Sequence, residues 1–280
     1  INKVIEKCGA DDDVVINVNG TVKGSQTLSG NIHVRSITIQ GNDDEIPDVL
    51  NGNQLGRVLT INTTSPVTIR NLTITGGKAN VNDNDVNDED DENNFGGGIM
   101  MTEGTIVTLA DGAVVGKAGV SKVATDNNYA NFAGLRGGGI YNQGGTLTLE
   151  SGSMVSYNYV KIYSIYYSTS TMGGAGIYSR GGEVIIEDGA EVMYNYSNSR
   201  GGGIHLDAGA KLTSSGKIDN NEADFYGGGV MFATYDGSNT DMITLYETTT
   251  FTMEGGSVSN NKTTFYEDMG WYSAGGGIFI

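Results

Sequence analysis

The stretch Gly137-Gly138-Gly139-Ile140 returns, with small changes, along most of the chain. Its six copies share three small residues followed by Ile or Val, and they begin at Gly96, Gly137, Gly174, Gly201, Gly227 and Gly275. A motif that recurs every few tens of residues is the signature of proteins built from stacked repeats. The sequence therefore predicts a repeat protein, and its function has to be read from how the repeats stack.

Each motif leads into short apolar segments at nearly constant offsets. Two repeats have identical offsets, which lead from Ile140 to Leu147, Leu149, Val155 and Asn158 and from Ile177 to Val184, Ile186, Val192 and Asn195. The shortest unit, from Gly201 to Gly227, is 26 residues long. It is too short for a strand, a helix and a second strand, and too long for a nonapeptide calcium roll. Without helical periodicity, the pattern predicts an all-β fold: a right-handed parallel β-helix (solenoid) with three short strands per coil.

The N-terminal part of the chain differs from the rest because residues 1–56 lack the glycine triplet. Terminal repeats of solenoids are commonly atypical, since they cover the end of the stack. We expect residues 1–56 to form an N-terminal cap with the first coils, and residues 57–280 to form β-helix repeats. We also expect the chain to be a fragment of a longer, processed protein, because it lacks an initial Met and its last motif is unfinished.

Two residue types in each repeat have predicted structural roles. Glycine admits backbone torsions that other residues avoid and leaves room where backbones approach closely. The asparagines at the end of each repeat are expected to stack in a turn, where their amides can bond to one another and to backbone groups. They are Asn158, Asn195, Asn221 and Asn261.

Composition narrows the classes of partner. The chain of 280 residues has 44 glycines and a formal net charge of −17. This charge repels nucleic-acid backbones and anionic membranes, so we expect no nucleic-acid partner. Cys8 is the only cysteine, which excludes an internal disulfide and a cysteine-based zinc site. No apolar run reaches about 18 residues, so the sequence predicts no transmembrane helix.

Two repeats link an apolar-x-x-Asn segment to the next glycine motif, through Ile218-x-x-Asn221-x-Ala223 and Val192-x-x-Asn195-x-Ser197. This arrangement resembles the linked F-x-x-N and G-G-A-I motifs of polymorphic outer membrane proteins and related adhesin-like bacterial surface proteins. Here Ile or Val replaces Phe, and Gly usually replaces Ala. The resemblance covers about residues 57–280. It implies a secreted or cell-surface, bacterial-like protein with an adhesive or structural role.

Side chains alternate along a strand, so the residue after each inward Ile should point outward. All six of these residues are large: Met100, Tyr141, Tyr178, His205, Met231 and Phe279. Beside a strip of glycines, they predict an exposed, shallow groove with an aromatic wall on which sugar rings could stack. The alternative is that these exposed rings only stabilise the sheet by stacking on one another.

A second outward column, three residues after each Ile, places Arg180 and Asp207 in adjacent coils near Tyr178 and His205. This is the best polar cluster in the sequence. A glycosidase requires two carboxylates about 5–10 Å apart, and the column offers only Asp207. A surface ion pair between Arg180 and Asp207 is therefore favoured over an active site, and no residue is assigned as catalytic.

Insertions before the glycine motif should gather at one edge of the solenoid, where repeat proteins commonly carry binding loops. Three of these insertions are rich in aromatic residues. The aromatic residues include Tyr129, Phe132, Tyr159, Tyr166, Tyr167, Trp271 and Tyr272. The last four are candidate contacts for a protein or a glycan. Alternatively, the loops cover the edge of the sheet and bury their own apolar groups.

The segment from Val81 to Asn94 is strongly acidic. Oxygen ligands at alternating positions suit calcium, and the candidate ligands are Asp83, Asp85, Asp88, Asp90 and Asp91. The segment lacks the register of an EF-hand loop, and charge-dense segments are more often solvated and mobile. Calcium is the only cofactor that the sequence suggests.

These observations leave three hypotheses for function. The first is an exported, non-catalytic surface protein whose β-helix binds a host or neighbouring-cell protein or glycan. The second is a carbohydrate-active enzyme, either a polysaccharide lyase or a glycoside hydrolase, that uses the outer face of the first sheet. The third is a filament or stalk subunit that self-associates through the ends of the β-helix or its edge loops.

Overall fold

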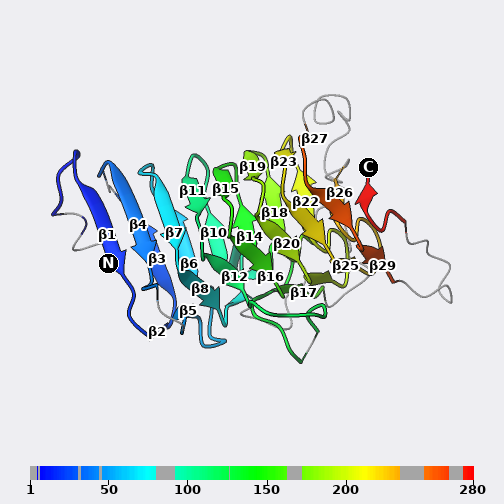
Figure 1. The fold of residues 1–280 in the computed structure, drawn as a ribbon, viewed down its shortest axis with the longest axis horizontal. Helices are drawn as coiled ribbons and strands as arrows, with labels where there is room; N and C mark the ends of the chain where they lie inside the picture. Colours follow the sequence, from blue (N-terminus) through cyan, green and yellow to red (C-terminus); the bar gives the residue numbers. More distant parts are fainter. Residues whose placement is uncertain are drawn as a thin grey trace.

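The computed structural model describes residues 5, 7–30, 33–43, 46–79, 92–125, 127–162, 172–233, 249–264 and 274–280. Their strands form four parallel sheets, and successive coils follow one another along the long axis of the molecule (Figure 1). The predicted all-β parallel solenoid is confirmed. Within the described ranges, no helix is long and apolar enough to cross a membrane.

Three of the sheets contain eight strands each. Sheet A consists of β1 (Asp13–Asn17), β4 (Ser36–Gln40), β7 (Val67–Arg70), β11 (Ile106–Leu109), β15 (Thr146–Leu149), β19 (Glu183–Ile186), β23 (Lys211–Ser214) and β27 (Thr250–Met253). Sheet B consists of β2 (Thr21–Lys23), β5 (Asp48–Asn51), β8 (Leu72–Thr75), β12 (Val114–Gly116), β16 (Met154–Ser156), β20 (Glu191–Met193), β24 (Lys217–Asp219) and β28 (Ser257–Ser259). Sheet C consists of β3 (Gln26–Ser29), β6 (Leu59–Asn62), β10 (Ile99–Met101), β14 (Ile140–Asn142), β18 (Ile177–Arg180), β22 (Ile204–Asp207), β26 (Val230–Phe232) and β30 (Ile278–Phe279).

Sheet D was not predicted, because its six strands have only two residues each. They are β9 (Lys78–Ala79), β13 (Phe132–Ala133), β17 (Tyr159–Val160), β21 (Tyr196–Ser197), β25 (Glu222–Ala223) and β29 (Lys262–Thr263). We call the residues between a strand of sheet D and the next strand of sheet C the return segment of a coil. The first return segment contains the 3-10 helix η1 (Glu92–Asn94). Isolated parallel bridges connect successive return segments, for example from Phe95 to Arg136 and from Arg200 to Tyr226.

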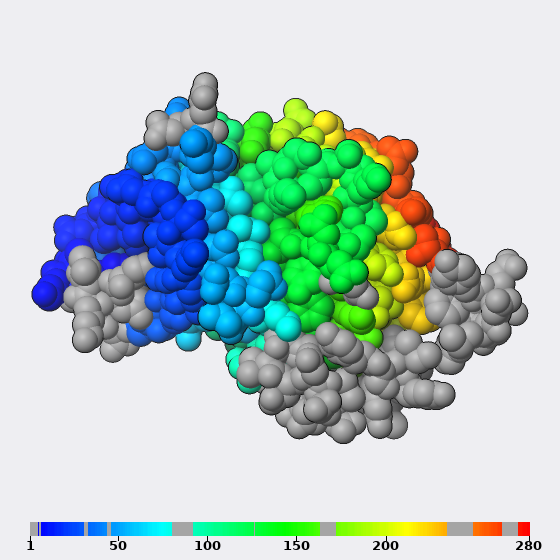
Figure 2. All heavy atoms as spheres, turned by 90° about the horizontal axis from the view of Figure 1, so that it is seen from below, coloured from blue at the N-terminus to red at the C-terminus, as the bar shows by residue number. Residues whose placement is uncertain are grey.

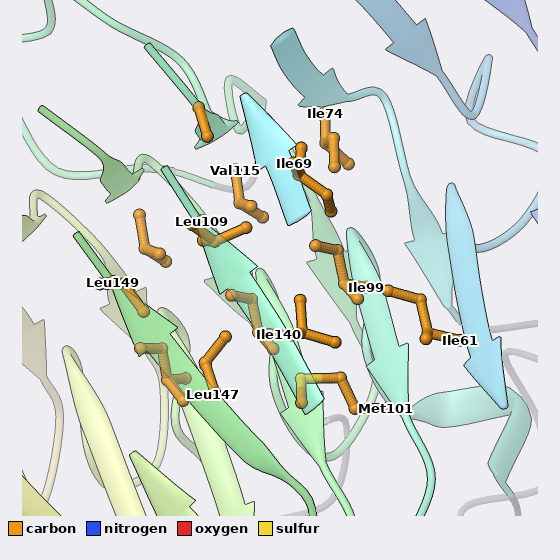
Figure 3. Close-up of a cluster of buried hydrophobic side chains, with 14 of the residues drawn as sticks. Ile61, Ile69, Ile74, Ile99, Met101, Leu109, Val115, Ile140, Leu147 and Leu149 are labelled. Atoms are coloured by element: carbon orange, nitrogen blue, oxygen red, sulfur yellow. The ribbon is translucent and has the colours of Figure 1, made fainter. Parts of the chain in front are cut away.

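The core consists of apolar side chains that stack in register from coil to coil. In sheet A, Ile69 pairs with Leu109 and Leu109 with Leu149, and in sheet C, Ile99 pairs with Ile140. All five are at most 1% exposed. Figure 3 shows these ladders meeting inside the solenoid. Each coil alone could not enclose this apolar surface, so stacking is what removes it from water.

The N-terminal residues already belong to the stack. Strands β1 to β5, within residues 13–51, occupy sheets A, B and C in register with the later coils. Ile5 precedes them and packs into the core with 2% of its surface exposed. Most of the described part of residues 1–56 is therefore made of coils, even though it lacks the glycine triplet.

The predicted asparagine ladder is present. Asn195 uses all of its amide: Nδ2 donates to Val155 O and Asn221 Oδ1, both at 3.0 Å, and Oδ1 accepts from Asn158 N and Nδ2, again at 3.0 Å. Asn221 continues the ladder to Asn261 in the same way. The ladder begins one coil earlier than predicted, because Asn131 Nδ2 donates to Asn158 Oδ1 at 2.9 Å.

The three glycines of a motif have different roles. Gly137 has a φ of 65°, in the left-handed region that favours glycine. A Cβ on Gly138 would lie 2.5 Å from Tyr159 O, in the next strand of sheet D. A Cβ on Gly139 would lie 2.6 Å from Gly176 O and 2.7 Å from Asn158 Nδ2. The motif therefore closes a turn and then brings sheet C against both sheet D and the asparagine ladder.

Asn195→Ala should lower the free energy of unfolding by about 3 kcal/mol, because it leaves several buried backbone and amide groups without partners. Urea denaturation followed by circular dichroism would measure the change. Asn127→Ala is the matched control, because Asn127 is exposed, and it should change stability by less than about 0.5 kcal/mol. Equal stabilities of the two variants would show that the ladder does not hold the coils together.

Gly139→Ala should destabilise the fold by about 2 kcal/mol or more, because the new methyl group overlaps backbone and amide atoms of the next coil. Gly9→Ala is the control: its Cβ would meet only the Asp12 side chain, at an ordinary 3.6 Å. Thermal denaturation of both variants would test this. A Gly139→Ala protein that melts with the unsubstituted chain would contradict the proposed close approach.

Candidate functional site

The predicted column on the outer face of sheet C exists, but the prediction that it is exposed is wrong. Register places Met100, Tyr141, Tyr178, His205 and Met231 side by side in successive strands. Tyr141 is 1% exposed, and Tyr178 and His205 are 0% exposed. Phe279, in the last strand, is half-buried. Met100, Tyr141 and Tyr178 point away from the main core and belong to a second buried cluster.

Return segments form the cover of this second core. Its members include Phe95, Leu135, Met172 and Ala175, which precede or belong to glycine motifs, together with Ile162. The ring centroids of Phe95 and Tyr141 are 4.8 Å apart. The chain therefore folds back over the glycine strip, so the predicted groove beside that strip is filled.

Stacked rings run along the column beneath this cover. Tyr141 and Tyr178 stack with centroids 5.6 Å apart and planes 24° apart, and Tyr178 and His205 are 4.7 Å apart. The alternative expectation, that neighbouring rings of this column contact one another, is therefore confirmed for these three rings, although they are buried and not exposed. Such pairs stabilise by about 0.5–1.5 kcal/mol beyond the apolar area that they bury.

Arg136 is the residue of this cluster that sequence reasoning missed. It is 3% exposed, and its guanidinium carbon lies 4.8 Å from the ring centroid of Phe95 and 5.6 Å from that of Tyr178. Arg200 takes the same position two coils later, 5.5 Å from the Tyr226 ring. A large residue directly before the glycine motif was the available signal, since Phe95, Arg136, Arg200 and Tyr226 all occupy that position.

Asp207 is engaged inside the fold. Tyr178 Oη donates to Asp207 Oδ2 at 2.7 Å, and the Ala208 backbone N donates to Asp207 Oδ1 at 2.7 Å. Arg180 pairs with Asp207 in register, as predicted. However, Asp207 is only 5% exposed, whereas Arg180 is exposed. The expectation of an ion pair at the surface is therefore wrong for the carboxylate, which lies in the second core.

The electrostatics of the two tyrosines follow from this enclosure. Burial raises the pKa of Tyr178 well above its ordinary value, and the negative charge of Asp207 raises it further. Burial also raises the pKa of Tyr141, while the positive charges of Arg136 and Arg180 partly oppose that shift. Both phenols are thus held in their neutral, hydrogen-bonding form. This chemistry suits packing and donation of hydrogen bonds rather than proton transfer near neutral pH.

Part of the predicted aromatic edge is also enclosed. Phe132 and Tyr159 are 2% and 3% exposed, so they do not form an open binding patch. Tyr159 stacks on Tyr196 with centroids 5.3 Å apart and planes 11° apart. Ala124 and Ala130 pack against this ladder, and Ala124 N donates to Tyr194 O at 3.1 Å. Figure 2 shows green residues of this part of the chain as a broad area at the middle of one face.

The remaining candidate residues lie outside the described ranges. They are Tyr166, Tyr167, Trp271 and Tyr272 of the edge loops and Asp83, Asp85, Asp88, Asp90 and Asp91 of the acidic segment. The roles predicted for them stay predictions. Among the residues that the structure describes, no group of three or more His, Cys, Asp or Glu side chains is arranged to hold a metal ion.

Comparison with known proteins does not assign this chain to a family. No family model matches it, and neither a curated protein nor a solved structure shows a significant match.

Tyr178→Phe should reveal the buried hydrogen bond and the shifted pKa. At pH 8, loss of the donor to Asp207 should lower the free energy of unfolding by about 1–3 kcal/mol. Above pH 10, the phenol ionises in the unfolded chain but not in the folded one, so the stability of the unsubstituted protein should fall as pH rises. This fall should be smaller in Tyr178→Phe and smaller still when Tyr141→Phe is added.

Urea denaturation at pH 8 and pH 10.5 would give both quantities. Tyr194→Phe is the control for removal of a tyrosine hydroxyl, because Tyr194 is half-buried and packs against a different cluster, that of Phe132 and Tyr159. If Tyr178→Phe kept the dependence on pH unchanged, Tyr178 would not be the group responsible.

Proposed function

We propose that this chain is an exported, non-catalytic β-solenoid that acts as an adhesin-like binding or structural scaffold at a bacterial cell surface. In this proposal the coil is right-handed, and its three longer strands, from sheets A, B and C, enclose the core. Its partners are a protein or glycan of a host or a neighbouring cell. The resemblance of its linked Asn and glycine motifs to those of bacterial surface proteins supports export and display.

One observation supports the proposal that the chain is not catalytic: the polar cluster on the outer side of sheet C is buried and contributes to the packing of the fold. Tyr178, His205 and Asp207 are at most 5% exposed, and Asp207 accepts hydrogen bonds at both carboxylate oxygens. A polysaccharide-cleaving site requires an open cleft with a second carboxylate or a metal-bound acidic cluster beside a base. The enclosed Tyr178, whose phenol pKa is raised well above its ordinary value by burial, supports a scaffold instead.

The regularity of the fold supports the scaffold role in a second way. Among the described residues, every strand pairing within the four sheets is parallel and in register from coil to coil, so the chain forms an extended body with repeating outer faces. Repeat proteins of this kind present long binding surfaces without needing a catalytic cleft. A protein built in this way can hold a ligand-binding face at a distance from its point of attachment.

The whole chain, immobilised on beads, should adhere to cells or to components of a glycan array and should release no product from a polysaccharide panel, with or without added calcium. Reducing-end release and ultraviolet absorbance of unsaturated uronates would detect hydrolase and lyase activity respectively. Asp207→Asn keeps the shape of the carboxylate and is the diagnostic variant. Cleavage that disappears in a folded Asp207→Asn protein would replace the scaffold proposal with an enzyme.

A further inference from the structure

The chain contains two Asn-Gly pairs, Asn19-Gly20 and Asn51-Gly52. In such a pair the backbone nitrogen of the glycine can attack the side-chain amide of the asparagine, because glycine has no Cβ to block the approach. The product of this attack is a cyclic succinimide. The two pairs are identical as dipeptides, so a difference in their reactivity has to come from the fold.

Asn51-Gly52 is held in place by its neighbours. Gly52 is buried, and its backbone N donates to Thr75 O in the next coil at 3.0 Å. Asn51 Oδ1 accepts from Asn53 N at 2.7 Å. A Cβ on Gly76 would lie 2.1 Å from the same oxygen, so the Asn51 amide packs directly against backbone. These contacts oppose the rotation that would bring the amide to Gly52 N.

Asn19-Gly20 lies in the turn between β1 and β2, and both residues are exposed. Gly20 has a φ of 69°, and a Cβ on it would meet nothing within 4 Å. The flanking backbone is anchored, because Val18 N donates to Gln40 O at 2.8 Å and Val49 N donates to Gly20 O at 2.9 Å. The pair is therefore open to water and fixed at both ends.

Two side chains of the next coil contact the groups of this pair that would react. Gly20 N donates to Asp48 Oδ1 at 2.5 Å, and Asn42 Nδ2 donates to Asn19 Oδ1 at 3.1 Å. Asp48 is 6% exposed, and its other oxygen accepts from Asn42 N at 2.6 Å. The Asp48 carboxylate is thus placed to take the proton of Gly20 N. The Asn42 amide is placed to stabilise negative charge that develops on Asn19 Oδ1.

We propose that Asn19-Gly20 is a site of self-catalysed deamidation, with Asp48 as the base and Asn42 as the donor to the oxyanion. Gly20 N forms a bond to Asn19 Cγ, and its proton passes to Asp48 Oδ1. The bond from Cγ to Nδ2 then breaks, and the amide nitrogen leaves as ammonia with the proton from Asp48. Water opens the succinimide at either carbonyl, which leaves aspartate or isoaspartate in place of Asn19.

Both products change the contact between the first two coils. Each adds a carboxylate near Asp48, and isoaspartate also lengthens the backbone between the anchored Val18 and Gly20. Like charges repel each other at short range, so the hydrogen bond from Gly20 N to Asp48 should weaken. The modification is therefore a slow and irreversible loosening of the first coils that requires no ligand.

The test is incubation of the whole chain at pH 7.4 and 37 °C in heavy-oxygen water, followed by peptide mapping with mass spectrometry. Opening of the succinimide incorporates one heavy oxygen, which separates new product from product that was already present. The product should accumulate at Asn19 at least tenfold faster than at Asn51. In urea, where the fold holds neither pair, the two pairs should react at similar rates.

Asp48→Asn removes the base and should slow the reaction at Asn19 by roughly tenfold. Asp43→Asn is the matched control, because it removes the same charge from an exposed position in the adjoining turn between β4 and β5, and it should leave the rate unchanged. Asn42→Ala changes an exposed residue and should also slow the reaction. Urea midpoints would establish that each variant folds.

The proposal is overturned if Asn19 and Asn51 react at equal rates in the folded chain. It is also overturned if Asn19 reacts in urea but stays unmodified in the folded chain, or if a folded Asp48→Asn protein reacts as fast as Asp43→Asn. A folded Asn42→Ala protein that reacts like the unsubstituted chain would contradict the role assigned to Asn42.

Discussion

The structure depends on the contact between the third glycine of each motif and the stacked asparagines. Asn158 and Asn195 sit between sheets B and D with every amide group bonded. Gly139 and Gly176 place backbone against them so closely that a Cβ would fall within 3 Å of an amide nitrogen. The ladder and the motif therefore form one unit, and this unit sets where the chain turns from sheet D back into sheet C. In the coils that contain the motif, this turn helps to keep the apolar ladders of the core in register.

The same turn determines which outer faces are accessible. Because the chain returns over the glycines, Phe95 and Arg136 lie above Tyr141 and Tyr178 and close the outer side of sheet C. Arg57 also fixes the first return segment, because its Nε donates to Phe95 O at 3.0 Å and to Gly96 O at 3.1 Å. The outer face of sheet A differs, because Ile106 in β11 is 44% exposed. Polar and aromatic side chains on the outer face of sheet C thus maintain the fold, whereas side chains on the outer face of sheet A keep partial contact with solvent.

Most of the fold could be predicted from the sequence, because the repeat imposes it locally. The fixed offsets from Ile140 to Asn158, repeated from Ile177 to Asn195, identify both the inward residues and the asparagine ladder. Sheet D could not be predicted, because a strand of two residues is too short to show an alternation of apolar and polar side chains. Asn131 was not predicted because the insertion of residues 117–130 obscures its offset. Arg136 was visible only as a large residue before a motif, and its burial could not be inferred from that position alone.

The sequence by itself determined which side chains face away from the main core, since alternation along a strand is a local property with a period of two. It correctly separated Ile140 from Tyr141 and identified Leu147 and Leu149 as apolar residues of the core. Only the tertiary structure decided whether an outward side chain meets solvent or protein. The exposure of an outward side chain depends on the position of the return segments. Contacts between coils that are distant in sequence determine that position. For this reason Tyr178 and Asp207 became part of the interior, while Ile106 on the outer face of sheet A remained at the surface.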